Sequence, residues 1–132
     1  VARLALLAPP PSGRAHAREL RALARLAGGG PADHGSAAGP DGIVAGGFAL
    51  GAGTLAELAR LDPFATPRPP APRILILERP DGPPVAEGCR IWALAGATIE
   101  AEPLAGYGEL MRDPLLSTPP RAAFARLVRF LA

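Results

Sequence analysis

The sequence contains no lysine, asparagine or glutamine, and its 132 residues include only one cysteine and one tryptophan. A single cysteine, Cys89, excludes an internal disulfide and a Cys-x-x-Cys metal or redox site. This usage indicates a reducing compartment, and we expect a cytoplasmic protein. The missing residue types accompany abundant alanine and arginine, a bias that reflects GC-rich coding and indicates no particular chemistry.

The sequence also lacks a long apolar run and a strong charge imbalance. The opening run from Val1 to Pro11 is too short for a membrane span and has no signal-peptide cleavage pattern. A net charge of +2 is too weak by itself to predict binding to nucleic acid or membranes. We therefore predict no nucleic-acid partner and no transmembrane segment. Because the first residue is Val1 rather than methionine, we expect the chain to begin within a longer protein.

The residues that are present predict one globular domain over residues 1–132. Hydrophobic residues make up 48% of the chain and charged residues 20%, which is the ordinary globular range. A chain of this length can bury a real core. Sixteen glycines and 17 prolines, 33 of 132 residues, indicate that some segments are loose.

Three segments carry strand patterns. Residues 4–8 and 74–77 are continuous apolar runs, typical of strands buried on both faces of a parallel sheet. Residues 97–101 alternate apolar and polar side chains, which also predicts a strand. Because helical patterns separate these runs, we expect an α/β fold with a small parallel sheet of three strands and flanking helices.

Four segments carry helical patterns. An apolar stripe at helical spacing predicts a helix over residues 15–27, and Thr54 with Glu57 predicts a capping box for a short helix ending near Asp62. The spacing of Val85, Cys89 and Trp92 predicts a third helix. Ser117 or Thr118 is expected to cap the last helix, whose apolar stripe consists of Phe124, Leu127, Val128 and Leu131.

Two segments between these elements predict little regular structure. Residues 28–47 are nearly all glycine, alanine, proline and aspartate, so we expect a poorly ordered connection. Residues 66–72 contain four prolines and predict a stiff spacer.

From Arg73 onward the order of elements resembles the C-terminal half of an α/β-hydrolase. In that family the penultimate strand ends in a motif like Gly-Glu-x-Asp, and Leu77-Glu78-Arg79-Pro80-Asp81 has its glutamate and aspartate at similar positions. The resemblance implies that Asp81 is the acid of a catalytic triad. A Pro-Asp-Gly sequence is also a strong turn signal in any protein, so an ordinary turn aspartate is the alternative.

The resemblance extends over the whole chain. The opening Leu-Ala-Pro-Pro-Pro-Ser-Gly and the ending Gly106-Tyr107…Met111-x-Asp113-Pro114 are similar to serine-aminopeptidase-like hydrolases encoded beside exosortase systems. Residues 1–13 then supply a first strand, residues 14–72 a lid-like insertion with its proline-rich linker, and residues 73–132 the final strand-helix-strand-helix. The implied substrate is a small ester, thioester or amide, with no cofactor and no metal.

Two departures from the family pattern predict an inactive chain. The nucleophile of such enzymes lies in a Gly-x-Ser-x-Gly turn, and none of the three serines, Ser12, Ser36 and Ser117, lies in that motif. The family's histidine follows the last strand, where residues 105–116 contain none and Leu115 takes its place. An aspartate without a histidine or a serine has nothing to act on, so we expect no catalysis by this chain alone.

The remaining titratable candidates have ordinary explanations. His16 and His34 show no metal-ligand spacing and are expected at the surface. Cys89 could act as a nucleophile, but its place on an apolar stripe favours a buried, inert thiol. Gly46-Gly47 and Gly51-x-Gly53 resemble a phosphate cradle only weakly, because no P-loop lysine follows them.

One charge pattern suggests a second function. Four arginines spaced by four, three and four residues lie on one face of the first predicted helix: Arg14, Arg18, Arg21 and Arg25. Such a face can bind an acidic surface, phosphate or membrane headgroups, or can simply be solvated. The alternative to a hydrolase is therefore a non-catalytic binding or assembly module. In either case the small sheet has an open apolar edge, which we expect a partner chain or the rest of the protein to cover.

Overall fold

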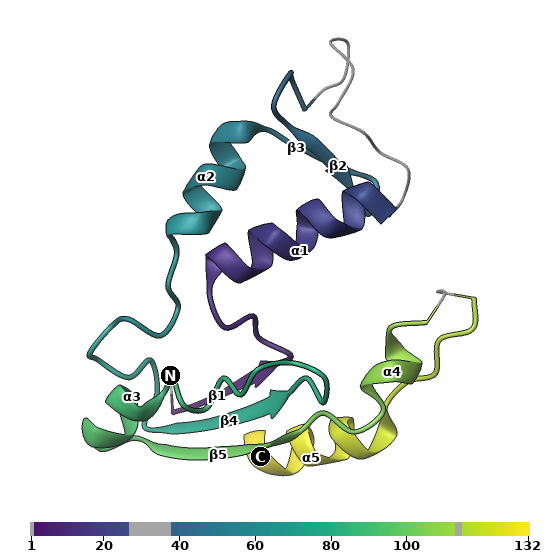
Figure 1. Ribbon diagram of the computed structural model, residues 1–132. Coiled ribbons are helices and arrows are strands. Elements are labelled where there is room, and N and C mark those ends of the chain that lie inside the picture. Colours follow the sequence, from purple (N-terminus) through teal and green to yellow (C-terminus); the bar gives the residue numbers. More distant parts are fainter. Residues whose placement is uncertain (1, 27–37, 113–114) are drawn as a thin grey trace. The chain divides into compact units, whose positions relative to one another are not determined.

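The computed structural model describes residues 2–26, 38–112 and 115–132 and divides into two compact units (Figure 1). The first unit contains residues 1–9 and 64–132, and the second contains residues 10–63. The chain therefore leaves the first unit after one strand and returns to it at Phe64.

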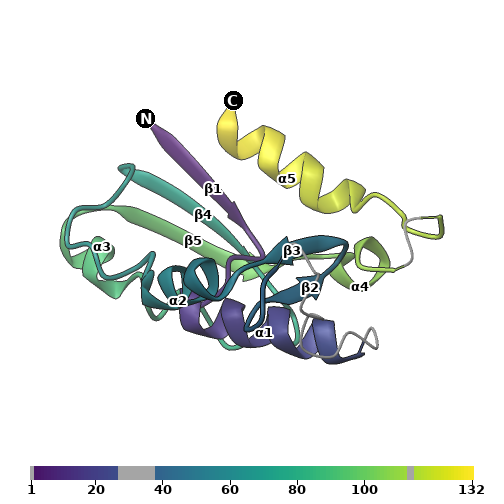
Figure 2. The same cartoon turned by 90° about the horizontal axis from the view of Figure 1, so that it is seen from above.

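The first unit contains a parallel sheet of three strands, in the order β1 (Arg3–Leu7), β4 (Arg73–Glu78) and β5 (Thr98–Pro103) (Figure 2). These strands confirm the predicted α/β class and the small parallel sheet. Their bounds differ by only a few residues from the predicted ones, because apolar runs locate strands better than they locate strand ends. The middle strand, β4, has a neighbour on both sides, whereas β1 and β5 each have one.

Strand β4 carries the core of the first unit, because its side chains are buried on both faces of the sheet. Ile74 and Ile76 belong to one apolar cluster, with Phe64 and Trp92, and Trp92 lies on the short helix α3 (Arg90–Leu94). Successive strand residues point to opposite faces, so the alternate side chains of β4 enter a second cluster. Its buried members are Leu75, Leu77, Leu104, Ala123 and Phe130, the last two from helix α5 (Arg121–Leu131).

Helix α3 is shorter than the spacing of Val85, Cys89 and Trp92 predicted. The segment before it forms tight turns, in which the N–H of Gly88 donates to the carbonyl oxygen of Val85 at 2.9 Å. All three predicted stripe residues are nevertheless buried. Trp92 is fixed by a hydrogen bond from Nε1 to the carbonyl oxygen of Thr66 at 2.8 Å.

Helix α5 corrects two predictions. It begins at Arg121 with Pro120 in the N-cap position, so neither Ser117 nor Thr118 caps it. The side chains of the predicted stripe, Phe124, Val128 and Leu131, are exposed, while Ala123 and Phe130 are buried and Leu127 is partly buried. Ala123, Leu127 and Phe130 form a neighbouring stripe at the same helical spacing, and this second stripe faces the sheet.

The second unit consists of helix α1 (Gly13–Leu26), the hairpin strands β2 (Ile43–Ala45) and β3 (Phe48–Leu50), and helix α2 (Ala52–Arg60) (Figure 1). Its buried residues are mostly small, and Leu55 is the one large buried side chain among the described residues. Helices α1 and α2 approach so closely that a Cβ on Gly13 would lie 1.9 Å from the carbonyl oxygen of Leu58.

The hairpin was not predicted from the sequence; it begins within the segment expected to be loose, residues 28–47, and ends just beyond it. Gly46 and Gly47 form its two-residue turn, with φ of 56° and 82°, both in the left-handed region that glycine adopts at little cost. Gly46 and Gly47 therefore belong to a hairpin turn and not to the phosphate cradle considered above. The capping box was wrong as well, because Gly51 is the N-cap of α2 and Thr54 lies inside the helix. Residues 28–37 of the predicted loose segment lie outside the described residues.

Candidate functional site

The candidate site is the carboxyl edge of the sheet in the first unit. Because β1, β4 and β5 are parallel, the segments that follow them leave from this same edge, where parallel sheets bind ligands. Strand β1 is followed by Ala8, which has a φ of 45° and whose N–H donates to the carbonyl oxygen of Leu77 at 2.8 Å. A non-glycine residue in the left-handed region is uncommon, and such strain concentrates at functional edges.

Asp81 lies in the loop that follows β4. The N–H of Gly82 donates to the carbonyl oxygen of Arg79 at 3.2 Å, which closes a turn through Pro80 and Asp81. The Asp81 side chain is 70% exposed, and its Oδ1 lies 3.7 Å from Nε of Arg79. The exposed position near a strand end agrees with both interpretations of Asp81, the triad acid and the turn aspartate.

Glu78, the last residue of β4, has a role that the sequence did not reveal. Its Oε1 accepts hydrogen bonds from the backbone N–H groups of Val85 and Ala86, at 2.7 and 2.8 Å. The carboxylate thus satisfies two donors at the start of the turns that lead to α3, as a capping side chain does. No short sequence motif links residues seven and eight positions apart in this way, so pattern analysis had no signal for it.

The loops after β4 and β5 meet through an arginine and a tyrosine. The guanidinium carbon of Arg79 lies 5.6 Å from the centre of the Tyr107 ring, a distance suited to a cation–π contact. Tyr107 begins the short helix α4 (Tyr107–Leu110) and packs against the cluster that contains Leu75 and Leu77. The loop that carries Asp81 is therefore anchored at Arg79 by a cation–π contact with Tyr107.

A pocket of about 220 Å³ opens near the same edge, between the end of β5 and the first turns of α5. Charged side chains line one part of it and apolar side chains the other. The lining residues are Leu77, Glu102, Pro103, Ala105, Ala122, Ala123, Arg126 and Arg129. Asp81 does not line this pocket, so the predicted site residue and the cavity do not coincide.

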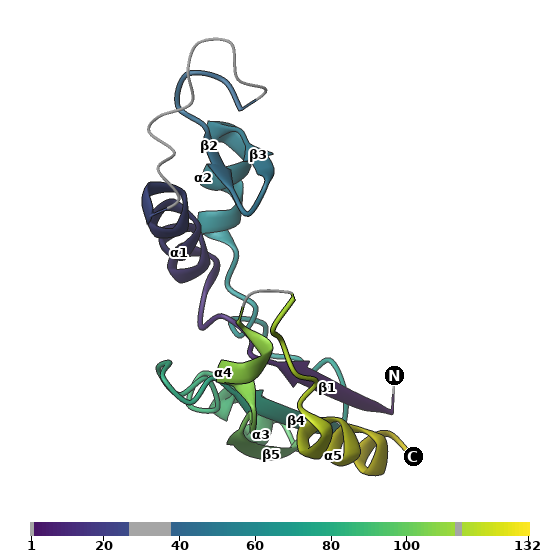
Figure 3. The same ribbon diagram turned by 90° about the vertical axis from the view of Figure 1, so that its right-hand side faces the viewer.

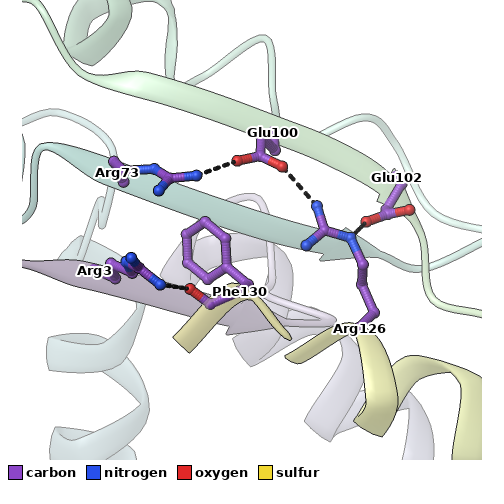
Figure 4. Close-up of polar contacts among 6 residues, drawn as sticks. All are labelled: Arg3, Arg73, Glu100, Glu102, Arg126 and Phe130. Carbon is purple, nitrogen blue, oxygen red and sulfur yellow. Dashed lines mark hydrogen bonds and ion pairs between the residues drawn. The ribbon is translucent and has the colours of Figure 1, made fainter. Parts of the chain in front are cut away.

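A charged cluster lies on the face of the sheet that α5 covers (Figure 4). Arg126 of α5 donates from Nε to Glu102 at 2.5 Å and from Nη2 to Glu100 at 2.6 Å. Arg73 of β4 reaches the other oxygen of Glu100 at 3.3 Å. The guanidinium carbons of Arg73 and Arg126 also lie 5.6 and 5.8 Å from the centre of the Phe130 ring.

The cluster shifts the protonation equilibria of Glu100 and Arg126. The hydrogen bond from Arg126 is the largest of the effects that lower the pKa of Glu100, and the bond to Glu100 in turn raises the pKa of Arg126. Both groups therefore stay ionised at every physiological pH. Because Arg126 is paired with both Glu100 and Glu102, the cluster links α5 to β5, although ion pairs open to solvent add little to stability.

Cys89 confirms the prediction of a buried thiol. Its side chain is fully buried in the cluster beneath α3. Burial, helped by the nearby negative charge of Glu78, raises the pKa of Cys89 to about 11. The thiolate is the nucleophilic form of cysteine, so Cys89 is a poor candidate for a catalytic group.

In the second unit, His16 and Asp62 line a mainly apolar pocket of about 260 Å³ between the start of α1 and the end of α2. Nδ1 of His16 lies 3.8 Å from a carboxylate oxygen of Glu19. Oγ of Ser12 accepts a hydrogen bond from the N–H of Ala15 at 3.2 Å and so caps α1. Ser12 therefore has a structural role in this arrangement.

The predicted arginine face forms as expected on α1. Arg14, Arg18, Arg21 and Arg25 are all exposed, and the described residues offer none of them an ion pair. Ser117 and Leu115 are exposed near the C-terminal helix. His34, Ser36, Asp113 and Pro114 lie outside the described residues.

Within residues 2–26, 38–112 and 115–132, no group of three or more histidine, cysteine, aspartate or glutamate side chains is arranged to hold a metal ion. In the same ranges no helix is both long enough and apolar enough to cross a bilayer. No protein-family model matches the chain, and no curated protein or solved structure matches it. Function must therefore be argued from the residues themselves.

Proposed function

We propose that this chain is the acid-bearing C-terminal part of a serine hydrolase, and that it is inactive by itself. Asp81 is the acid of the triad, and the serine and histidine come from outside the segments that carry the resemblance. In the complete enzyme the reaction is hydrolysis of an ester, thioester or amide, and residues 14–72 form a lid over the substrate. The lone, buried Cys89 supports a cytoplasmic location.

The observation that carries the proposal is the position of Asp81. It follows the middle strand of a parallel sheet by three residues, and its carboxylate is 70% exposed at the edge where such sheets bind ligands. A triad aspartate must reach the imidazole of a histidine, hold its ring in one orientation and stabilise its charged form. An exposed carboxylate on a loop anchored by the contact between Arg79 and Tyr107 can do so without moving the sheet.

The edge strand β1 supports a sheet that continues further. Of its two sides, only the one toward β4 is paired in the described chain, and Leu7 at its end is 42% exposed. An unpaired strand edge offers free backbone donors and acceptors to another strand. In the proposed enzyme, strands that carry the Gly-x-Ser-x-Gly turn pair with this edge, either from the same polypeptide or from a partner chain.

The test begins with the reading frame that contains residues 1–132. The proposal requires a Gly-x-Ser-x-Gly turn encoded there or in a co-purifying partner, and its absence from both would overturn it. The 132-residue chain alone is expected to hydrolyse p-nitrophenyl acetate no faster than buffer.

In the complete enzyme, Asp81→Asn should lower kcat by about 10⁴-fold, because an amide cannot hold the histidine in the correct tautomer. Glu109→Gln, a change of the same kind at an exposed position of α4, serves as the matched control and should leave kcat unchanged. Equal kcat in the Asp81 variant and the wild type would show that Asp81 is an ordinary turn residue.

A further inference from the structure

Helix α1 presents an exposed surface that the proposed hydrolase function does not use. The helix contains four arginines and one glutamate, and at 3.6 residues per turn the arginines fall within roughly 60° of arc. All four are exposed, and no described residue forms an ion pair with them. Four like charges this close repel one another, so the surface favours an anionic partner.

The same helix also exposes two leucines. Leu23 is 54% exposed and Leu26 is 84% exposed, although the face of α1 that packs within its unit consists of Gly13, Ala17 and Ala24. Between the arginine stripe and the leucines the helix carries only the small side chains of Ala15 and Ala22. A flat surface that touches these alanines is therefore within reach of the leucines on one side and the long arginine side chains on the other.

We propose that α1 binds the surface of an anionic lipid bilayer. The arginines contact headgroup phosphates, and Leu23 and Leu26 enter the boundary between headgroups and acyl chains, as in amphipathic helices that lie in the plane of a membrane. The exposed leucines favour a bilayer over a nucleic acid, because a phosphate backbone offers them no apolar phase. Glu19, the one acidic residue of α1, lies on the leucine side with its carboxylate 3.8 Å from Nδ1 of His16.

The first test measures co-flotation of the 132-residue chain with two kinds of vesicle. We expect binding to vesicles of equal parts phosphatidylcholine and phosphatidylglycerol at low salt, weaker binding at high salt, and little binding to pure phosphatidylcholine. Equal binding to both kinds of vesicle, or no binding at low salt, would refute the proposal.

A charge-matched pair of variants then locates the surface. Changing all four α1 arginines to alanine should weaken binding by about 600-fold, since each basic residue near an anionic surface contributes about fivefold. The control changes four exposed arginines elsewhere to alanine and gives the same net charge of −2, from +2 minus four. These control positions are Arg68, Arg90, Arg121 and Arg129. If both variants lose binding equally, net charge rather than α1 is responsible.

Further variants separate a bilayer surface from other phosphate-bearing ligands. Lysine at all four α1 positions should retain binding, because headgroup attraction requires charge and not the bidentate geometry of arginine. Leu23→Ser combined with Leu26→Ser should weaken binding about tenfold without changing its dependence on salt. Displacement by inorganic phosphate at constant ionic strength would indicate a discrete phosphate site, and binding to a short DNA duplex in preference to vesicles would indicate a nucleic-acid surface. Either result would overturn the bilayer proposal.

Circular dichroism separates these effects from unfolding. Alanine is the best helix former, so the arginine-to-alanine variant should keep its helical signal. If that variant unfolds, the lysine and serine variants still decide the question, because they leave the packed face of α1 unchanged.

Discussion

The two units of this protein are built from different elements, a parallel sheet with helices in one and two helices with a short hairpin in the other (Figures 2 and 3). The sheet unit buries large side chains on both faces of β4, whereas the second unit buries mostly glycine and alanine, with Leu55 as its large core residue. The first arrangement gains stability from apolar area removed from water. The second gains it from close backbone approach, as at Gly13, and buries less apolar area for each residue it must order.

This difference also explains where sequence patterns succeeded. Short runs of large apolar residues favour a buried strand, so residues 4–8 and 74–77 were predicted as strands, and alternation of apolar and polar side chains predicted the third. Small residues carry little periodic signal. The hairpin of β2 and β3 was missed because each strand has only three residues, and because a glycine pair is found in flexible loops as well as in hairpin turns.

The largest expected effect comes from truncating the core of the sheet unit. Leu75 is fully buried in β4, so Leu75→Ala should lower the free energy of unfolding by about 3 kcal/mol, through lost burial and the cavity left behind. Urea unfolding followed by fluorescence of Trp92, which lies in the same unit, measures the change.

Leu55→Ala is the matched control in the second unit, since Leu55 is 1% exposed. If the two units unfold separately, this variant lowers the helical signal at low urea but does not move the Trp92 transition. A shift of equal size in the Trp92 transition of both variants would show that the two units unfold together. The difference in their packing would then not correspond to a difference in their stability.

The second prediction concerns the buried thiol of the sheet unit. Since the pKa of Cys89 is raised from 9.0 to about 11, its thiolate fraction at pH 8 is about 100-fold lower than that of an unfolded chain, and alkylation by iodoacetamide should slow by at least that factor. Rates are compared with and without urea. Equal rates would mean that the core beneath α3 opens readily.

The same shift predicts a pH dependence of stability. The folded state holds the Cys89 proton more tightly than the unfolded state, so this residue favours folding below pH 9 and the contribution is lost as the pH rises toward 11. Cys89→Ala should remove this dependence. An unchanged alkaline decline in the variant would assign it to other groups.

The third prediction tests close backbone packing in the second unit. A Cβ on Gly13 would lie 1.9 Å from the carbonyl oxygen of Leu58 and 2.8 Å from that of Leu61, so Gly13→Ala must separate α1 from α2 and should cost about 2 kcal/mol. Thermal unfolding followed by circular dichroism reports the loss.

Gly53→Ala is its control, because Gly53 lies in α2 with no atom within 4 Å of the added Cβ. This change should stabilise the helix by about 0.5–1 kcal/mol. If both substitutions behave alike, the two helices are not in the close contact described.

The smallest expected effect is at the charged cluster of the sheet unit. Arg126→Met keeps a long side chain at this position but removes the guanidinium, and with it the hydrogen bonds to Glu100 and Glu102 and the cation–π contact with Phe130. Ion pairs that are partly open to solvent contribute little, so the midpoint of thermal unfolding should fall only slightly, and less at high salt than at low salt. A loss as large as that of Leu75→Ala would show that the cluster, rather than apolar burial, holds α5 in place.

The candidate site was predicted only in part, for a physical reason. The local signal at residues 77–82 correctly placed Asp81 on a loop at the end of a strand, while its catalytic role stays a prediction. Other contacts of the site join residues seven or more positions apart. They are the hydrogen bonds that Glu78 accepts from Val85 and Ala86, the contact of Arg79 with Tyr107, and the cluster around Arg126. Such contacts form only in the packed fold and produce no periodic pattern in the sequence.

One backbone contact has a consequence for how the gene can vary. The N–H of Gly13 donates to the carbonyl oxygen of Leu61 at 2.9 Å, so the polypeptide enters and leaves its second unit at adjacent points. A module with neighbouring ends can be shortened, exchanged or excised with a splice of a few residues. Joining Ser12 to Asp62 through a short glycine-serine linker should therefore leave the parallel sheet intact. The second unit could then be exchanged for another insertion, in evolution or by protein engineering.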